Sequence, residues 1–145
     1  MAIERIAVVG AGQMGTGIAQ VAAQAGIRVT LVDGVPGLVG HSHGKTAGVL
    51  QKLVEKGKLT AEQRQGILDR IRPGDAVEDA AGSDLVVEAI VEKEEPKVEL
   101  FRKLDALLPP HAILASNTST LDVNKIAAFT KRPQDVIGPH FFSPA

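Results

Sequence analysis

The sequence predicts an α/β domain built on a doubly wound, mostly parallel sheet with helices on both faces. Two observations support this fold class. Short, continuous apolar runs such as RIAVVG (5–10) and DLVVEA (84–89) are typical of strands that are buried on both faces. Amphipathic segments at helical spacing lie between such runs, so strand and helix alternate along the chain. This alternation is typical of the crossover units of a parallel sheet.

Composition and charge limit the function classes. The 145 residues suit one domain, and the formal net charge of −1 provides no basic field for nucleic acid or an anionic membrane. Cysteine is absent, which excludes disulfides and thiolate chemistry. No apolar run approaches the roughly 20 residues of a membrane helix, and the first residues carry charges where a signal peptide is apolar. We therefore expect a cytoplasmic domain with neither a nucleic acid nor a membrane as partner.

The first three elements form a strand–helix–strand unit. The strand at 5–10 is followed by MGTGIAQVAAQAG (14–26), in which apolar residues recur at helical spacing and the final glycine is a stop signal. RVTLVD (28–33) is rich in β-branched residues and predicts the second strand.

The elements that follow are less regular. Five glycines and one proline occur in residues 34–48, so we expect a helix only from about Lys45 to Lys56. TAEQ (60–63) has the form of a capping box and predicts the start of a short helix. The remaining predicted elements are a strand at 84–89, a helix at 96–108, a strand at 112–116, a short helix near 122–128 and a strand at 135–138.

A glycine motif lies between the first strand and the first helix. GAGQMG supplies Gly10 for a tight turn, Gly12 for close approach of a pyrophosphate, and Gly15 for close packing of helix on strand. The amides of Gln13 and Met14 then point from the helix N-terminus toward that anion. The strand before the motif and the helix after it are the context that a Rossmann dinucleotide-binding site requires.

Asp33 ends the second strand, where an acidic side chain can accept both hydroxyls of an adenosine ribose. A carboxylate at this place repels the 2′-phosphate of NADP, and the next residue is glycine rather than arginine. The pattern therefore predicts NAD as the cofactor. The alternative is an aspartate that only closes the strand into a turn.

Polar residues also follow two later strands, at the edge where ligands of parallel sheets bind. SNTS (116–119) suits hydrogen bonds to a nicotinamide ribose and a substrate oxygen, although Ser119 can also cap the next helix. His140 follows the strand at 135–138, and a histidine is the natural proton acceptor when an alcohol loses a hydride to NAD. A histidine bonded to a turn is the alternative for this residue.

Other polar residues carry weaker predictions. Three histidines lie in polar or glycine-rich stretches without ligand spacing, so we expect no metal site. Three lysines share one helical face, which is either solvated or in contact with ligand phosphates. The histidines are His41, His43 and His111, and the lysines are Lys45, Lys52 and Lys56.

Several segments together resemble one family. From about Ile3 to Ala145 the chain resembles the NAD-binding domain of the L-3-hydroxyacyl-CoA dehydrogenases. The segments that carry this resemblance are GAGQMGTGIA, DLVVEAIVE, LFRKLD, LASNTSTLDV and HFFSPA. The resemblance implies that His140 is the catalytic base for the 3-hydroxyl proton and that Ser119 bonds the same substrate oxygen. It further implies cofactor contacts from Ala89, Glu92, Lys97 and Asn117, and a contact to coenzyme A from Lys56.

Two features depart from the family pattern. Single-function members mostly carry an asparagine, on the nicotinamide side of the site, at the position of Ser143. A serine at this position makes the chain more similar to the dehydrogenase part of bifunctional hydratase–dehydrogenase proteins. The family also has a regular helix where residues 34–44 are rich in glycine, so this chain departs from the family in the segment that leads to Lys56.

The resemblance implies a function in fatty acid β-oxidation. A hydride passes from C3 of an L-3-hydroxyacyl-CoA to NAD, and an all-helical domain closes the acyl-CoA cleft and forms a homodimer. Residues 1–145 correspond to the cofactor domain without that helical domain, so we expect this chain alone to be inactive. A stand-alone NAD(H)-binding module is the alternative, whereas a phosphogluconate-type dehydrogenase is disfavoured by the HFFSP segment.

Overall fold

A computed structural model describes residues 3–74, 76–90, 94–116 and 130–137 of the protein. In these residues six strands form one parallel sheet with the order β3-β2-β1-β4-β5-β6, which confirms the predicted fold class. The chain moves outward from β1 in one direction and then from β4 in the other, so the switch point lies between these two strands. The elements are β1 Arg5–Val9, α1 Gln13–Gln24, β2 Arg28–Val32, α2 Leu38–Glu55, α3 Ala61–Arg70, β3 Ile71–Gly74, η1 Val77–Ala80, β4 Leu85–Glu88, α4 Glu94–Leu107, β5 Ile113–Ser116, η2 Pro133–Asp135 and β6 Val136–Ile137.

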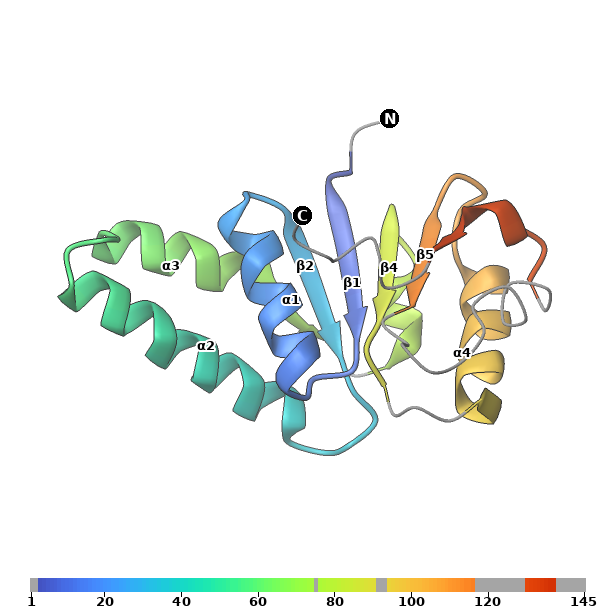
Figure 1. The fold of residues 1–145 in the computed structure, drawn as a ribbon, viewed down its shortest axis with the longest axis horizontal. Coiled ribbons are helices and arrows are strands. Elements are labelled where there is room, and N and C mark those ends of the chain that lie inside the picture. Colours follow the sequence, from blue (N-terminus) through green and yellow to red (C-terminus); the bar gives the residue numbers. More distant parts are fainter. Residues whose placement is uncertain (1–2, 75, 91–93, 117–129, 138–145) are drawn as a thin grey trace.

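The sheet has a separate apolar core on each face. Along β1, Ile6 and Val8 belong to a cluster with α1, α2 and α3, whereas Ala7 and Val9 belong to a cluster with Phe101 of α4. Alternate residues of a strand point to opposite faces, so β1 is buried on both sides. Figure 1 shows α1 against the sheet, α2 and α3 extending from it as an antiparallel pair, and α4 beside β5.

The helix α2 corrects the prediction for the glycine-rich stretch. It begins at Leu38, seven residues before the predicted Lys45, and runs through three glycines. Its buried face consists of Ser42, Thr46 and Leu50, at a spacing of four residues. The Ser42 hydroxyl also lies 2.6 Å from that of Thr16 on α1. Packing against α1 therefore outweighs the low helix propensity of glycine.

The sequence reading missed one strand. The edge strand β3 has the sequence IRPG, in which proline lacks an amide donor and glycine weakens a strand. Only Ile71 and Gly74 are buried in it. An edge strand tolerates such residues, but it shows no apolar pattern by which to find it.

The other predicted elements within the described residues are confirmed, with small shifts at their ends. The predicted helix near 122–128 lies outside the described residues. The capping box is present, because the Thr60 hydroxyl accepts from the Gln63 amide and the Gln63 side chain accepts from the Thr60 amide. Among the described helices, none is long and apolar enough to cross a membrane.

Candidate functional site

The glycine loop lies at the carboxyl end of β1, and its outer glycines are required by the fold. Gly10 has φ of +115°, and a Cβ there would overlap the carbonyl of Ala89 at the end of β4. A Cβ at Gly15 would overlap the Gly10 carbonyl oxygen. A Cβ at Gly12, in contrast, would meet nothing within 4 Å. The loop is therefore tight where it packs on the protein and open at Gly12, where a pyrophosphate is expected.

Helix α1 begins directly after this loop. Gln13 and Met14 are its first two residues and both are exposed, and no side-chain hydrogen bond caps the helix at Gly12. Backbone amides in a first turn and the helix dipole favour a bound anion. This arrangement fits the predicted pyrophosphate site.

Asp33 connects the second strand to the glycine loop. Its Oδ2 atom accepts a hydrogen bond from the Ala11 amide at 2.8 Å, and its Oδ1 atom accepts one from the Val35 amide at 2.7 Å. The Gly10 amide also donates to the Val32 carbonyl at 2.8 Å. Each carboxylate oxygen has two acceptor sites, so these bonds leave capacity for ribose hydroxyls. Sequence reasoning predicted the ribose contact but missed this support of the loop.

A buried polar cluster occupies the carboxyl ends of β4 and β5. The Glu88 carboxylate accepts hydrogen bonds from the Lys97 ammonium at 3.0 Å, the Ser116 hydroxyl at 2.7 Å and the Ile90 amide at 2.8 Å. The Glu88, Lys97 and Ser116 side chains are all fully buried. Glu88 was not predicted as a site residue, although a carboxylate inside the apolar run LVVEA is itself a signal of a buried partner.

The structure brings some of the predicted site residues together. Ala89 donates from its amide to the Val9 carbonyl at 2.8 Å, so it lies beside Gly10 of the loop. Lys97 lies in the first turns of α4, and its ammonium is bound to Glu88 inside the protein. Sequence reasoning gave Lys97 a cofactor contact and did not foresee this ion pair.

Lys56 is not brought to the loop. It caps the C-terminal end of α2, is exposed, and lies at the far tip of the α2–α3 pair (Figure 1). Helix α2 has 18 residues, which corresponds to a length of about 27 Å. Any contact of Lys56 with coenzyme A is therefore remote from the glycine loop.

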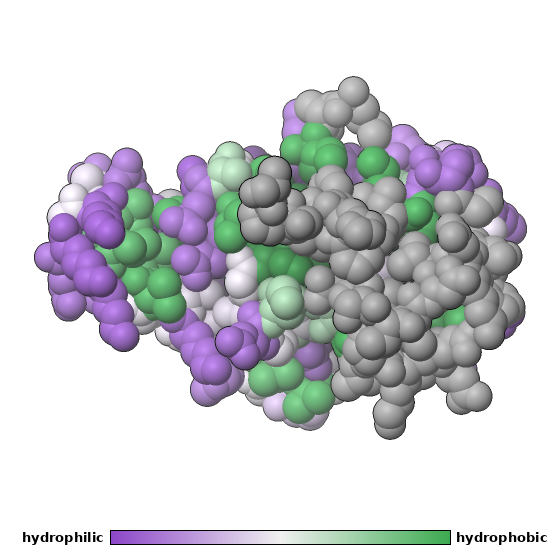
Figure 2. Space-filling view, in the orientation of Figure 1, coloured by the Kyte–Doolittle hydropathy of each residue, from purple (hydrophilic) through white to green (hydrophobic). Residues whose placement is uncertain are grey.

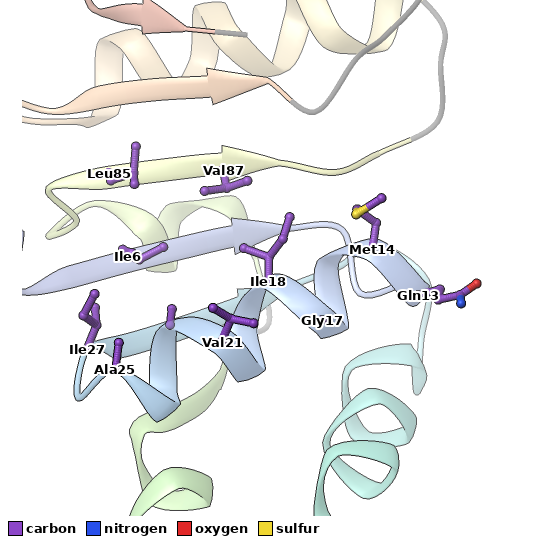
Figure 3. Close-up of a pocket in the computed structure, with 11 residues that line it drawn as sticks. Ile6, Gln13, Met14, Gly17, Ile18, Val21, Ala25, Ile27, Leu85 and Val87 are labelled. Atoms are coloured by element: carbon purple, nitrogen blue, oxygen red, sulfur yellow. The ribbon is translucent and has the colours of Figure 1, made fainter. Parts of the chain in front are cut away.

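An apolar groove of about 880 Å³ extends from the loop along α1. Figure 3 shows that Met14, Ile18 and Val21 of α1 form one wall, opposite side chains from β1 and β4. Figure 2 shows hydrophobic surface beside α1 on the same face of the molecule. Gln13 is the one polar side chain of the described lining, so the groove offers little for phosphates or ribose hydroxyls. The lining residues are Ile6, Gln13, Met14, Gly17, Ile18, Val21, Ala22, Ala25, Ile27, Leu85 and Val87.

Five predicted site residues lie outside the described part of the chain: Glu92, Asn117, Ser119, His140 and Ser143. Within the described ranges, no group of three or more histidines or acidic residues could hold a metal ion.

Comparisons with known proteins agree with this geometry. The model of the family "3-hydroxyacyl-CoA dehydrogenase, NAD binding domain" matches residues 5–145. A probable 3-hydroxybutyryl-CoA dehydrogenase of Bacillus subtilis is 46% identical over 144 residues, which are 99% of this chain and 50% of the relative. The crystal structure of Mycobacterium tuberculosis FadB2 superposes with a TM-score of 0.90 at 42% identity, covering 95% of this chain and 49% of that one. The crystal structure of a 3-hydroxybutyryl-CoA dehydrogenase of Escherichia coli superposes with a TM-score of 0.92 at 38% identity, covering 95% of this chain and 29% of that one.

The chain spans about half the length of the first two relatives and less of the third. The family match covers nearly all of this chain, and the glycine loop, Asp33 and the strand order agree with it. The chain therefore belongs to the 3-hydroxyacyl-CoA dehydrogenase family, whose NAD-binding domain it contains.

Proposed function

We propose that this chain binds NAD in preference to NADP and supplies the cofactor-binding part of a dehydrogenase acting on 3-hydroxyacyl-CoA substrates of the 3-hydroxybutyryl-CoA type. Relatives that are named 3-hydroxybutyryl-CoA dehydrogenase support the substrate class. A role in fatty acid β-oxidation, a cytoplasmic location and a homodimer formed through a further helical domain belong to the same proposal.

The bracing of the glycine loop by Asp33 carries the cofactor part of the proposal. The carboxylate lies beside the open side of the loop, since it accepts the Ala11 amide next to Gly12. A carboxylate in this position suits the two free hydroxyls of the NAD ribose and repels the phosphate of NADP.

The proposed chemistry is the oxidation of a secondary alcohol. Bound NAD supplies the acceptor for the hydride that leaves C3 of the substrate. His140 takes the hydroxyl proton as the C3–O double bond forms, and Ser119 donates a hydrogen bond to the same oxygen. These two roles rest on the family resemblance of LASNTSTLDV and HFFSPA.

Calorimetric titration of the chain with NAD and with NADP tests the proposal. We expect saturable NAD binding and clearly weaker NADP binding. Absence of NAD binding, or tighter binding of NADP, would contradict it.

A further inference from the structure

We infer that Glu88 is a positioning residue for the nicotinamide half of the cofactor site. It acts by holding the ammonium group of Lys97, for which the family resemblance implies a contact to the cofactor. This inference rests on the proposed function, because it assumes that the chain binds NAD. Nothing in the family resemblance assigned Glu88 a role, and the residue emerged from its contacts in the structure.

Glu88 holds three chain segments at one point. Its Oε2 atom accepts from the Lys97 ammonium of α4 and from the Ile90 amide after β4, and its Oε1 atom accepts from the Ser116 hydroxyl at the end of β5. The carboxylate and both side-chain donors are fully buried. Hydrogen bonds to a buried charged group are short, directional and costly to lose, so the three segments are fixed relative to one another.

The location of this point relates it to the cofactor. Glu88 pairs with Val9 in β1 and with Ser116 in β5, so it lies in the last row of the sheet before the strands end. Val9 directly precedes the glycine loop, and Ala89 packs on Gly10 of that loop. In parallel α/β sheets the dinucleotide lies across this edge, with its two halves on either side of the switch point. β1 and β2 carry the predicted pyrophosphate and adenosine contacts, which leaves the β4–β5 side for the nicotinamide half.

Stability alone gives a weak reason for this cluster. Burying two charges costs much of what their attraction returns, and well-packed apolar residues are often as stable as a buried ion pair. A single apolar side chain at residue 88 would fill the sheet without an ion pair. A fixed ammonium at the edge where the cofactor binds is something that an apolar pair cannot provide.

The two roles predict different binding behaviour. A positioning role for the nicotinamide half predicts weaker binding of NAD and unchanged binding of ADP, which contains only the adenosine and pyrophosphate part. A general structural role predicts that both ligands bind more weakly, because both use the same sheet edge. The ratio of the two affinities therefore separates the roles.

The experiment measures NAD and ADP affinities by calorimetry for the 145-residue chain and four variants. These are Glu88→Gln, Lys97→Met, the double variant of both, and Glu99→Gln as a control that removes an exposed charge from α4. We expect Glu88→Gln to weaken NAD binding about tenfold or more, with ADP binding changed less than about twofold. We expect no effect of Glu99→Gln.

The double variant tests the route through Lys97. If Glu88 acts by placing the Lys97 ammonium, Glu88→Gln has no further effect on NAD binding once Lys97 is methionine, and the two effects are not additive. The double variant leaves no unpaired buried charge, so its NAD and ADP affinities, compared with those of the wild-type chain, still separate the two roles if either single variant does not fold.

Four outcomes overturn the inference. Parallel losses of NAD and ADP binding in a folded Glu88→Gln variant indicate a structural role only, and normal NAD binding by that variant indicates no role. Additive effects in the double variant exclude the route through Lys97. A wild-type chain that binds neither ligand overturns the proposed function as well, which distinguishes that failure from the others.

Discussion

The Oδ2 atom of Asp33 lies 2.8 Å from the amide nitrogen of Ala11, so the residue after β2 fixes the loop after β1. The Val35 amide binds the other carboxylate oxygen at 2.7 Å and holds the side chain in this orientation. The residue that we expect to select the ribose is therefore also the residue that shapes the pyrophosphate loop.

Replacing Asp33 is expected to affect both properties. Asp33→Ala removes the ribose acceptor, the repulsion of a 2′-phosphate and the bond to Ala11, so NAD affinity falls about tenfold or more and the preference over NADP narrows. Calorimetric titration with both cofactors measures this. Asp69→Ala removes an exposed carboxylate on α3 and is the matched control. An unchanged ratio of NAD to NADP affinity in Asp33→Ala would show that selection occurs elsewhere.

Replacing Gly15 or Gly17 of α1 with alanine is expected to change the free energy of unfolding in opposite directions. A Cβ at Gly15 would overlap the Gly10 carbonyl, whereas a Cβ at Gly17 would meet nothing within 4 Å. Gly15→Ala should lower the free energy of unfolding by about 1–3 kcal/mol through overpacking. Gly17→Ala should raise it by about 0.5–1 kcal/mol, because alanine favours a helix interior. Urea denaturation measures both, and equal effects would contradict the close packing of α1 on the loop.

The sequence predicted the first strand–helix–strand unit and its glycine motif because local signals and tertiary packing agree there. Gly10, Gly12 and Gly15 recur at a spacing that one turn geometry explains, and the structure has that turn. In α2 the local signals and the tertiary packing disagree. Its glycines predict a late start, but the buried Ser42 face binds α1 and extends the helix to Leu38.

The missed features depend on contacts between distant residues. The strand β3 has no apolar pattern of its own, and only pairing of residues 71–74 with β2 defines it. The Glu88 cluster joins residues up to 28 positions apart, so the carboxylate inside LVVEA indicates a buried partner, but no local spacing identifies that partner. His140 and Ser119 were predicted from strand ends and family resemblance, and they remain predictions because they lie outside the described residues.

Arg132 closes the C-terminal end of α4 and is expected to contribute strongly to stability. Its guanidinium donates to the Asp105 carboxylate at 2.7 Å and to the carbonyl oxygens of residues 105, 108, 109 and 112. Arg132 and Asp105 are both largely buried, so Arg132→Ala removes the ion-pair partner of a buried carboxylate, to which the Lys131 amide still donates, and should cost about 3–5 kcal/mol in the free energy of unfolding.

The neighbouring Lys131 gives a matched control for this prediction. Its side chain is exposed, so Lys131→Ala should change the free energy of unfolding by less than about 0.5 kcal/mol. Chemical denaturation of both variants measures the difference. A loss below about 1 kcal/mol for Arg132→Ala would show that the carbonyl oxygens find other partners.

Asp84 is expected to make the free energy of unfolding depend on pH in the acid range. The hydrogen bond from His111 at 2.9 Å, followed by the amides of Glu4 and Arg5, lowers the pKa of the Asp84 carboxyl below its ordinary value. A lowered folded-state pKa stabilises the protein above the unfolded pKa, about 3.9, and this stabilisation is lost as pH falls through the lower folded value.

The Asp84→Asn variant tests this dependence. We expect it to lose about 1 kcal/mol of stability at neutral pH, a small value because the carboxylate is partly exposed and screened. Its stability should then fall less steeply than that of the wild type below about pH 4. Denaturation at several pH values measures both curves, and parallel curves would exclude Asp84 as a source of the acid dependence.

The 145 residues alone are expected to bind NAD without turning over 3-hydroxybutyryl-CoA. This chain aligns with about half of the length of the relatives, and Lys56, the residue predicted to contact coenzyme A, lies exposed at the far tip of α2. Positioning of the substrate and exclusion of water supply a large part of the rate of such enzymes, and both need a second wall of the cleft.

NADH absorbance after mixing the chain with NAD and substrate measures turnover, with a full-length relative as the positive control. Turnover of about 1–10³ per second by these residues would show that they are catalytically complete. In that case His140→Ala should lower the rate about 10²–10⁴-fold with little change in NAD affinity, because a general base acts on the proton rather than on the cofactor.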